Sequence, residues 1–170
     1  MSGLLSSTID GLRGLPPEYV VFIVSALPIF EIRGGVIAGI LLGLPLKSVM
    51  VFGFLGNIAS VTPILLFLEP LSKWLYGNRL ADRLLHWLFA RARRKADQIN
   101  RWGPLGLMLF TAIPLPVSGA WTATLCSILL GVRRSRAIAS IYAGIIIAGI
   151  FVSILTLGGI AGVRTLSSAP

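Results

Sequence analysis

The stretch Ala26-Leu27-Pro28-Ile29-Phe30-Glu31-Ile32-Arg33-Gly34-Gly35 decides how the first part of this chain folds. It places a proline, two glycines and two opposite charges inside an otherwise apolar segment that runs from residue 19 to residue 46. Ionisable side chains at membrane depth are costly, and they usually mark a transport path or a partner buried in protein. A second stretch, residues 112–121 (AIPLPVSGAW), repeats the Ala-(Leu/Ile)-Pro opening 86 positions later (26 to 112), which indicates two halves of one site.

The composition is that of an integral membrane protein. Hydrophobic residues make up 55% of the 170 residues and charged residues 12%, and the mean hydropathy is +0.88. A chain of this length and composition is expected to form a single membrane domain, residues 1–170, with no sizeable soluble part. The net charge of +9 does not indicate a nucleic-acid partner, because eight of the fifteen Lys and Arg residues fall between Lys73 and Arg101, beside apolar segments.

The apolar segments come in two lengths, which predict the fold class. About twenty helical residues cross a bilayer core; the stretches within 47–69 and 137–161 reach that length, whereas the arms on either side of both breaks have about ten residues. We therefore expect an all-α integral membrane protein with two full transmembrane helices, two re-entrant helical hairpins and amphipathic surface helices. The predicted segments are an interfacial segment (1–18), a re-entrant hairpin (19–46), a transmembrane helix (47–69), a basic amphipathic segment (70–101), a second re-entrant hairpin (102–131) and a transmembrane helix (137–161).

The first hairpin has one alternative, a single long crossing over residues 19–46. That helix would carry Glu31 and Arg33 without a break, against the local proline and glycines. In the hairpin, a smooth face for close helix packing is predicted from three glycines spaced by four, Gly35, Gly39 and Gly43. On the next helix, Asn57 is either an interhelical hydrogen-bonding group or a contact to the transported molecule.

The basic residues predict the side that each segment faces. If the first hairpin returns to the side it came from, the 47–69 helix crosses to the other side, where the basic segment lies. The second hairpin then leaves Arg133, Arg134 and Arg136 on that same side. The positive-inside rule assigns this side to the cytoplasm. We expect the plasma (inner) membrane, a cytoplasmic 70–101 segment in contact with anionic lipid head groups, and both termini on the opposite side.

The same topology makes the second half an inverted copy of the first. Inverted-repeat transporters build their substrate site where two broken segments from opposite faces meet near the midplane. The backbone groups freed at each break need protein, water or substrate as partners, because lipid supplies none. The predicted site residues are Glu31, Arg33, Gly34, Gly35, Asn57, Pro114, Pro116, Ser118 and Gly119.

The chemistry expected at this site starts from the two breaks. Each returning arm is expected to begin a helix there, at Gly34-Gly35 and at Ser118-Gly119. Helix N-termini favour anions, and with Arg33 as a bidentate donor they could hold a phosphate head group. Ser118 either adds a hydroxyl or only caps its helix. Glu31 either pairs with Arg33 or is partly desolvated and exchanges protons in a coupling cycle.

The break L-P-x-x-E-x-R-G (27–34), followed by P-L-P-x-S-G-A-W (114–121), resembles the small multidrug export protein family, which is grouped by similarity with the DedA-like membrane proteins. The resemblance covers nearly the whole chain. It implies an inverted repeat with two re-entrant hairpins, and roles in proton-linked lipid-carrier transport, lipid scrambling or tolerance of cationic drugs. The motif positions that it implies are Glu31, Arg33, Gly34, Pro114, Pro116, Ser118 and Gly119.

Two transport hypotheses follow. The first is a transporter or flippase for an anionic lipid carrier such as a polyprenyl phosphate, favoured by Arg33 and the helix termini. The alternative is a proton-coupled exporter of small cationic compounds, favoured by Glu31 and the family name. A structural, lipid-organising protein is a third hypothesis. An enzyme is not expected, because the only histidine, His86, lies in the basic segment away from Ser118.

The expected partners are a membrane lipid or small-molecule substrate and, from the small-residue packing faces, a second copy of the chain in a homodimer. No cofactor and no metal site are expected, because the chain lacks a Cys/His/carboxylate cluster suited to a metal.

Overall fold

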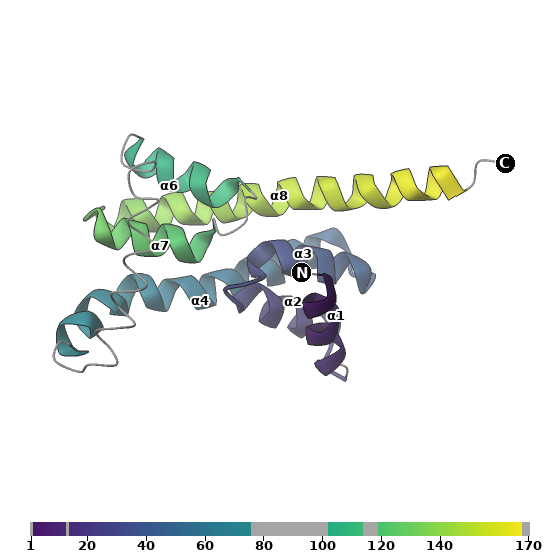
Figure 1. Cartoon of the computed structure of the whole chain (residues 1–170), viewed down its shortest axis with the longest axis horizontal. Helices are drawn as coiled ribbons and strands as arrows, with labels where there is room; N and C mark the ends of the chain where they lie inside the picture. Colours follow the sequence, from purple (N-terminus) through teal and green to yellow (C-terminus); the bar gives the residue numbers. More distant parts are fainter. Residues whose placement is uncertain (1, 13, 76–101, 114–118, 168–170) are drawn as a thin grey trace. The chain divides into compact units, whose positions relative to one another are not determined.

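The computed structural model describes residues 2–12, 14–75, 102–113 and 119–167. These residues form seven helices and no strand (Figure 1), which confirms the all-α prediction for this part of the chain. The helices are α1 (Ser2–Gly11), α2 (Pro17–Ala26), α3 (Glu31–Leu41), α4 (Leu46–Leu75), α6 (Gly103–Ala112), α7 (Ala120–Leu129) and α8 (Arg134–Ser167). Most of the predicted basic segment, residues 76–101, lies outside the described residues.

Two helices are long and apolar enough to cross a membrane. In α4 the stretch is Leu46–Phe67, 22 residues with a mean hydropathy of 1.9, and in α8 it is Arg134–Gly162, 29 residues with a mean hydropathy of 2.4. Only 33% and 39% of their most apolar windows are buried in the protein. Large apolar side chains such as Phe67 and Ile154 therefore stay exposed, as suits helices that face lipid. Both helices extend beyond the predicted 47–69 and 137–161.

The first apolar segment is broken by its proline. Helix α2 ends at Ala26 and α3 begins at Glu31, so an unbroken helix over residues 19–46 does not form. Leu27 precedes Pro28 and adopts φ −74° and ψ 131°, the extended conformation that a residue before proline prefers. Ile113, before Pro114, does the same at the end of α6 with φ −73° and ψ 124°. The cause of both breaks is therefore local.

The chain separates into two compact units. Unit 1 comprises Met1–Asn57 and Ile146–Pro170, and unit 2 comprises Ile58–Ile145. Each unit holds one pair of short helices, either hairpin 1 (α2 and α3) or hairpin 2 (α6 and α7). Each also holds the beginning of the long helix that follows its hairpin and the end of the other long helix.

Unit 1 packs through glycines that bring helix backbones together. A Cβ atom on Gly56 of α4 would overlap the carbonyl oxygen of Phe22 and lie 2.9 Å from its carbonyl carbon, so α4 and α2 touch backbone to backbone. A Cβ atom on Gly39 of α3 would lie 2.7 Å from Val49 and 2.9 Å from Val21. Small residues at helix crossings permit this close approach.

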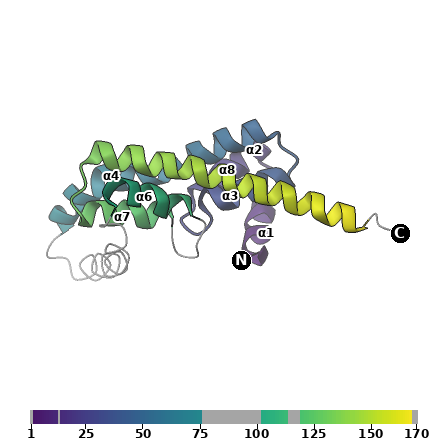
Figure 2. The ribbon, with the colours of Figure 1, turned by 90° about the horizontal axis from the view of Figure 1, so that it is seen from above.

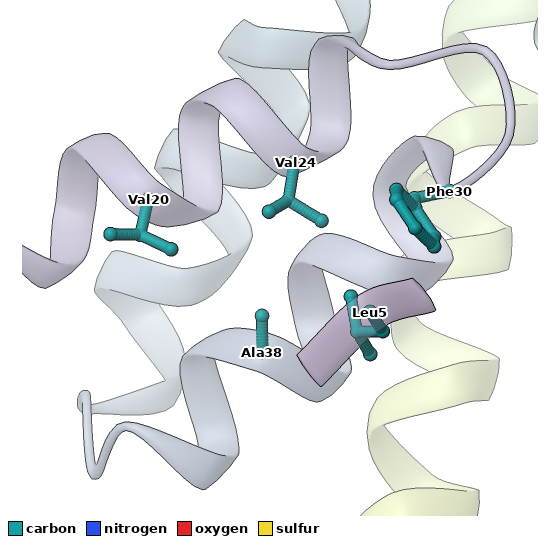
Figure 3. Packing of buried hydrophobic residues seen from close by; sticks show 5 residues of the cluster. All are labelled: Leu5, Val20, Val24, Phe30 and Ala38. Atoms are coloured by element: carbon teal, nitrogen blue, oxygen red, sulfur yellow. The ribbon is translucent and has the colours of Figure 1, made fainter. Parts of the chain in front are cut away.

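Helix α1, in the predicted interfacial segment, packs on hairpin 1. Leu5 is 9% exposed and shares a buried apolar cluster with Val20, Val24, Phe30 and Ala38 (Figure 3). Phe30 directly precedes α3, and Figure 3 shows its ring beside the Leu5 side chain. Part of the N-terminal segment therefore covers the break of hairpin 1.

Unit 2 combines the same glycine packing with a hydrogen bond. A Cβ atom on Gly144 of α8 would lie 2.7 Å from the carbonyl oxygen of Met108, so α6 lies directly against the first part of α8 (Figure 2). The hydroxyls of Thr62 on α4 and Tyr142 on α8 are 2.6 Å apart. Because Thr62 donates its proton to the carbonyl oxygen of Ile58 at 2.7 Å, Tyr142 is the donor in the bond between the helices.

The two hairpins repeat each other's local structure. Helix α6 follows α2 by 86 positions at both ends (17 to 103 and 26 to 112), and α8 begins 88 positions after α4 (46 to 134). Each second arm is followed by a glycine with positive φ, Gly43 at 76° and Gly131 at 61°. The same three backbone hydrogen bonds surround both glycines. At Gly43 the N–H groups of residues 42, 43 and 44 donate to the carbonyl oxygens of residues 38, 40 and 39, in that order. At Gly131 the N–H groups of residues 130, 131 and 132 donate to the carbonyl oxygens of residues 126, 128 and 127.

These bonds satisfy the last carbonyl groups of α3 and α7, as left-handed glycines at helix ends commonly do. Gly43 therefore terminates α3, and no atom lies within 4 Å of the Cβ it would carry. The prediction that Gly43 belongs to a packing face of α3 is wrong, whereas Gly35 and Gly39 do contact neighbouring helices.

Candidate functional site

Glu31 is the first residue of α3 and the most unusual residue at the hairpin 1 break. Its side chain is buried, with 7% exposed. Its φ is 52°, which makes it the one residue other than glycine with a positive φ in the described part of the chain. A carboxylate is favoured at a helix N-terminus, where the helix dipole is positive. The left-handed conformation costs about 1–3 kcal/mol, however, and such strain tends to cluster at functional sites.

Arg33 follows in the first turn of the same helix. Its side chain is half-buried, and the charge of Glu31 attracts its guanidinium. Two opposite charges in one apolar helix stabilise each other, because neither keeps its full hydration shell there. The structure therefore keeps these two predicted site residues in one electrostatic unit at the hairpin tip.

The prediction that the second arm begins its helix at Gly34-Gly35 is wrong. The N–H groups of Phe30 and Glu31 both donate to the carbonyl oxygen of Leu27, at 3.2 and 2.9 Å, and α3 follows this turn at once. The N–H of Gly34 donates to the carbonyl oxygen of Phe30 at 2.9 Å, so it is already used within the helix. Gly34 instead makes room for a side chain, because a Cβ atom there would lie 2.5 Å from the Cβ of Phe30.

Ser25, in the last turn of α2, is a buried polar residue that sequence reasoning missed. It is 0% exposed, and its hydroxyl has no hydrogen-bond partner among the described residues. A Cβ atom on Gly35 would overlap this hydroxyl oxygen, and a Cβ atom on Gly53 of α4 would lie 3.5 Å from it. The hydroxyl thus sits where α2, α3 and α4 meet. The available signal was Ser25's position as the one hydroxyl inside the apolar run from Val20 to Ala26.

Asn57 is fully buried, with 0% exposed. It continues a buried face of α4 that comprises Val49, Gly53, Gly56, Asn57, Val61 and Leu65. Gly53, one turn earlier on that face, is the residue that approaches Ser25. Asn57 therefore faces the protein interior, and both of its predicted roles, an interhelical hydrogen-bonding group or a contact to the transported molecule, stay predictions.

In hairpin 2 the structure describes one predicted site residue, Gly119. This residue is buried, has an extended backbone (φ 171°, ψ −176°) and accepts the N–H of Ala123 through its carbonyl oxygen at 2.9 Å. Helix α7 thus begins at Ala120, within one residue of the predicted start. The other predicted residues of this break lie outside the described residues: Pro114, Pro116 and Ser118.

The predicted site residues fall into both units. Glu31, Arg33, Gly34, Gly35 and Asn57 belong to unit 1 and Gly119 belongs to unit 2, and a meeting of the two tips stays a prediction.

The buried hydroxyls of hairpin 2 are satisfied within their own helices. Thr111, Thr124 and Ser127 donate to backbone carbonyl oxygens three or four residues earlier, at 2.8, 2.6 and 2.7 Å. In the described ranges, no three His, Cys, Asp or Glu side chains are grouped as metal ligands. The polar groups that set the described site apart are therefore the carboxylate, guanidinium, hydroxyl and amide of unit 1.

Comparison with protein families matches residues 31–151 to the family model described as "Putative small multi-drug export protein". The match begins at Glu31 and covers more than two thirds of the 170 residues. It includes the end of the first break, the whole of the second break and the whole of α4. It also includes about the first half of α8, as far as residue 151. The comparisons with curated proteins and with solved structures found no match.

Proposed function

Because the chain belongs to the small multi-drug export protein family, we propose that it is a membrane exporter in which substrate and proton share the carboxylate of Glu31. The observation that carries this proposal is the state of Glu31, a buried acid held at φ 52° in the first residue of α3. A buried carboxylate is stabilised by a positive charge beside it, here the guanidinium of Arg33, and a proton or a cationic substrate can take the place of that charge. Protonation and a cationic substrate are therefore alternatives for the same group, which is the basis of coupled exchange.

The architecture that we propose for this transport is an inverted repeat of two re-entrant hairpins whose tips meet near the midplane. Its support is the internal repeat of helix lengths and helix-ending glycines, together with short arms of 10 or 11 residues where about twenty would be needed to cross. This is also what a relationship to the DedA-like proteins implies, and we include that relationship in the proposal.

The orientation that we propose follows from the basic residues. Residues 70–101 and the arginines that precede and begin α8 face the cytoplasm, both termini lie on the other side, and the membrane is the inner membrane. The proposal contains no chemical conversion of the substrate and no cofactor.

A second candidate function is movement of an anionic lipid carrier such as a polyprenyl phosphate, and Arg33 is the observation that favours it. Its half-buried guanidinium is suited to a bidentate bond with phosphate. We rank it second because Glu31 itself occupies the start of α3 and the N–H of Gly34 is used within the helix. A phosphate would therefore meet a carboxylate where the sequence had predicted free donors.

The test is transport of a fluorescent quaternary ammonium dye by the full chain in proteoliposomes, with and without an imposed pH gradient. We expect Glu31→Gln to slow dye movement by about tenfold or more and to remove its response to the gradient, because an amide neither pairs as an anion nor releases a proton. Glu18→Gln is the matched control, since Glu18 lies in the first turn of α2 at the far end of the same hairpin. A Glu31→Gln protein that transports like the wild type would reject the proposal.

The second candidate is tested in the same vesicles with a labelled polyprenyl phosphate. Loss of its movement in Arg33→Gln but not in Arg136→Gln, with no dye movement by the wild type, would replace the first candidate by the second. If the wild type moves neither probe, a lipid-organising role is favoured over both transport functions.

A further inference from the structure

A cavity away from both hairpin tips carries an inference that does not depend on the proposed transport. It lies in unit 2 where α7 ends and α8 begins, and its volume is about 290 Å³. Six of the residues that line it are Leu65, Ser127, Ile128, Val132, Arg133 and Arg134. The lining thus joins an apolar wall to two guanidinium groups.

The two sides of the cavity differ in exposure. Leu65 and Ala137 are 2% and 1% exposed and lie behind the cavity surface, the half-buried Ile128 and Val132 present apolar surface to it, and both arginines are exposed. The hydroxyl of Ser127 donates to the carbonyl oxygen of Thr124 at 2.7 Å, and the positively charged side chains of the lining are those of Arg133 and Arg134. The cavity therefore offers an apolar interior and a cationic rim.

The turn between α7 and α8 does not need these arginines. The corresponding turn between α3 and α4 has the same positive-φ glycine and the same three backbone bonds. The residues 88 positions before Arg133 and Arg134 are Pro45 and Leu46, which carry no charge. Because one turn geometry forms with and without arginines, Arg133 and Arg134 are not needed for the turn itself and are available, besides their part in orientation, for a contact at the cavity.

The chemistry of the cavity selects an amphiphilic anion. Guanidinium groups form charge-assisted, often bidentate, hydrogen bonds with phosphate oxygens. An apolar wall beside them suits the glycerol and first acyl carbons of a lipid. In a membrane protein, phosphate groups of anionic phospholipids are attracted to basic residues close to the membrane surface. We infer that this cavity binds the phosphate head group of an anionic phospholipid through Arg133 and Arg134.

The experiment measures binding of dioctanoyl phosphatidylglycerol to the full chain in a neutral detergent, with dioctanoyl phosphatidylcholine as the zwitterionic comparison. We expect the anionic lipid to bind more tightly and the double variant Arg133→Gln/Arg134→Gln to weaken it by about tenfold or more. The control is Arg136→Gln, which removes the same type of charge two residues beyond Arg134 but is not part of the lining. We expect that variant to bind within about twofold of the wild type, because a surface charge outside the contact contributes little.

A second variant keeps every charge and changes only the shape of the cavity. Val132→Phe enlarges a half-buried lining residue, and we expect it to weaken phosphatidylglycerol binding by about tenfold while the melting temperature without lipid stays near that of the wild type. Wild-type binding by Val132→Phe, or an equal loss in Arg136→Gln, would overturn the cavity as the site. Equal binding of the two lipids by the wild type would overturn the anionic preference, even if the variants fail to fold.

Inorganic phosphate separates a lipid site from a free-anion site. We expect phosphate at the lipid's concentration to leave phosphatidylglycerol bound, because phosphate gains nothing from the apolar wall. Displacement of the lipid by an equal concentration of phosphate would overturn the lipid assignment.

Discussion

Hairpin 1 and hairpin 2 have the same scaffold but carry different chemistry at their breaks. Both consist of two short helices, both leave the first helix at a residue with an extended backbone before proline, and both are followed by a left-handed glycine. Yet α3 begins with a buried glutamate at φ 52°, followed by an arginine, whereas α7 begins after Gly119 in an unstrained extended conformation. The described helices of the scaffold therefore form both beside a break that carries two charges and beside a break whose sequence carries none.

The buried hydroxyls show the same contrast. Ser25 and Thr111 lie at corresponding positions of α2 and α6, 86 residues apart, and both are buried. Thr111 donates to the carbonyl oxygen of Leu107 at 2.8 Å, whereas the hydroxyl of Ser25 has no partner within the described ranges. The buried hydroxyls of Thr111, Thr124 and Ser127 in hairpin 2 are therefore satisfied within their own helices, and the buried hydroxyl of Ser25 in hairpin 1 is not.

The largest effect on stability is expected at a feature that both hairpins share, the glycine of a long helix that lies against the first helix of the hairpin. Gly56→Ala should destabilise the protein by about 3 kcal/mol or more, because the new Cβ meets the backbone of Phe22, which cannot move aside. Gly144→Ala should also be costly, since its Cβ would lie 2.7 Å from the Met108 carbonyl oxygen. The measurement is the midpoint of unfolding by sodium dodecyl sulfate in mixed micelles.

Gly53→Ala is the control for the Gly56 prediction. Its Cβ would lie 3.4 Å from the nearest atom, on Ile32, which is ordinary contact, and alanine raises helix propensity by about 1 kcal/mol. If Gly56→Ala proves as stable as Gly53→Ala, the close approach of α2 and α4 does not exist.

An intermediate effect is expected where the hairpins differ, at Glu31. The Glu31→Gly variant should be more stable to unfolding than the Glu31→Ala variant by about 1–2 kcal/mol, because only glycine adopts a left-handed φ without strain. At Glu18, inside the first turn of α2, the Glu18→Ala variant should instead be more stable than Glu18→Gly by about 1 kcal/mol, as is usual in a helix. Thermal unfolding of the four variants in detergent measures both differences. If the alanine variant is the more stable one at both positions, the backbone of Glu31 is not strained.

The smallest effect on stability is expected at Ser25 and Thr111, the two buried hydroxyls at corresponding positions of α2 and α6. Ser25→Ala should leave stability unchanged or raise it by about 1 kcal/mol, because it removes a buried hydroxyl without a partner. Thr111→Val should lower stability by about 1 kcal/mol, because it removes a satisfied one. The same unfolding measurement applies. A loss of stability in Ser25→Ala would mean that the hydroxyl binds a group such as water inside the protein.

The sequence by itself determined the class of the protein and the places where its short helices end. The prediction of an all-α membrane protein rests on the long apolar segments of the sequence. The ends of α2 and α6 are explained by prolines that restrict the backbone of the residues before them. These causes act within a few neighbouring residues. The resemblance to the small multidrug export protein family is confirmed by the family match over residues 31–151, and its two motifs are each short stretches that can be found in the sequence alone.

Only the tertiary structure decided how particular residues are used. It moved the start of α3 from Gly34 to Glu31, turned Gly34 and Gly35 from expected anion donors into packing residues, and buried Ser25 against a helix that begins some twenty residues later. It also placed Arg133 and Arg134 beside a cavity that includes Leu65 of α4. The start of α3 and the role of Gly34 depend on the turn formed by residues 27–31. The roles of Gly35, Ser25, Arg133 and Arg134 depend on which other helix comes to lie against each residue, and hydrophobicity and local propensity contain no information about that choice.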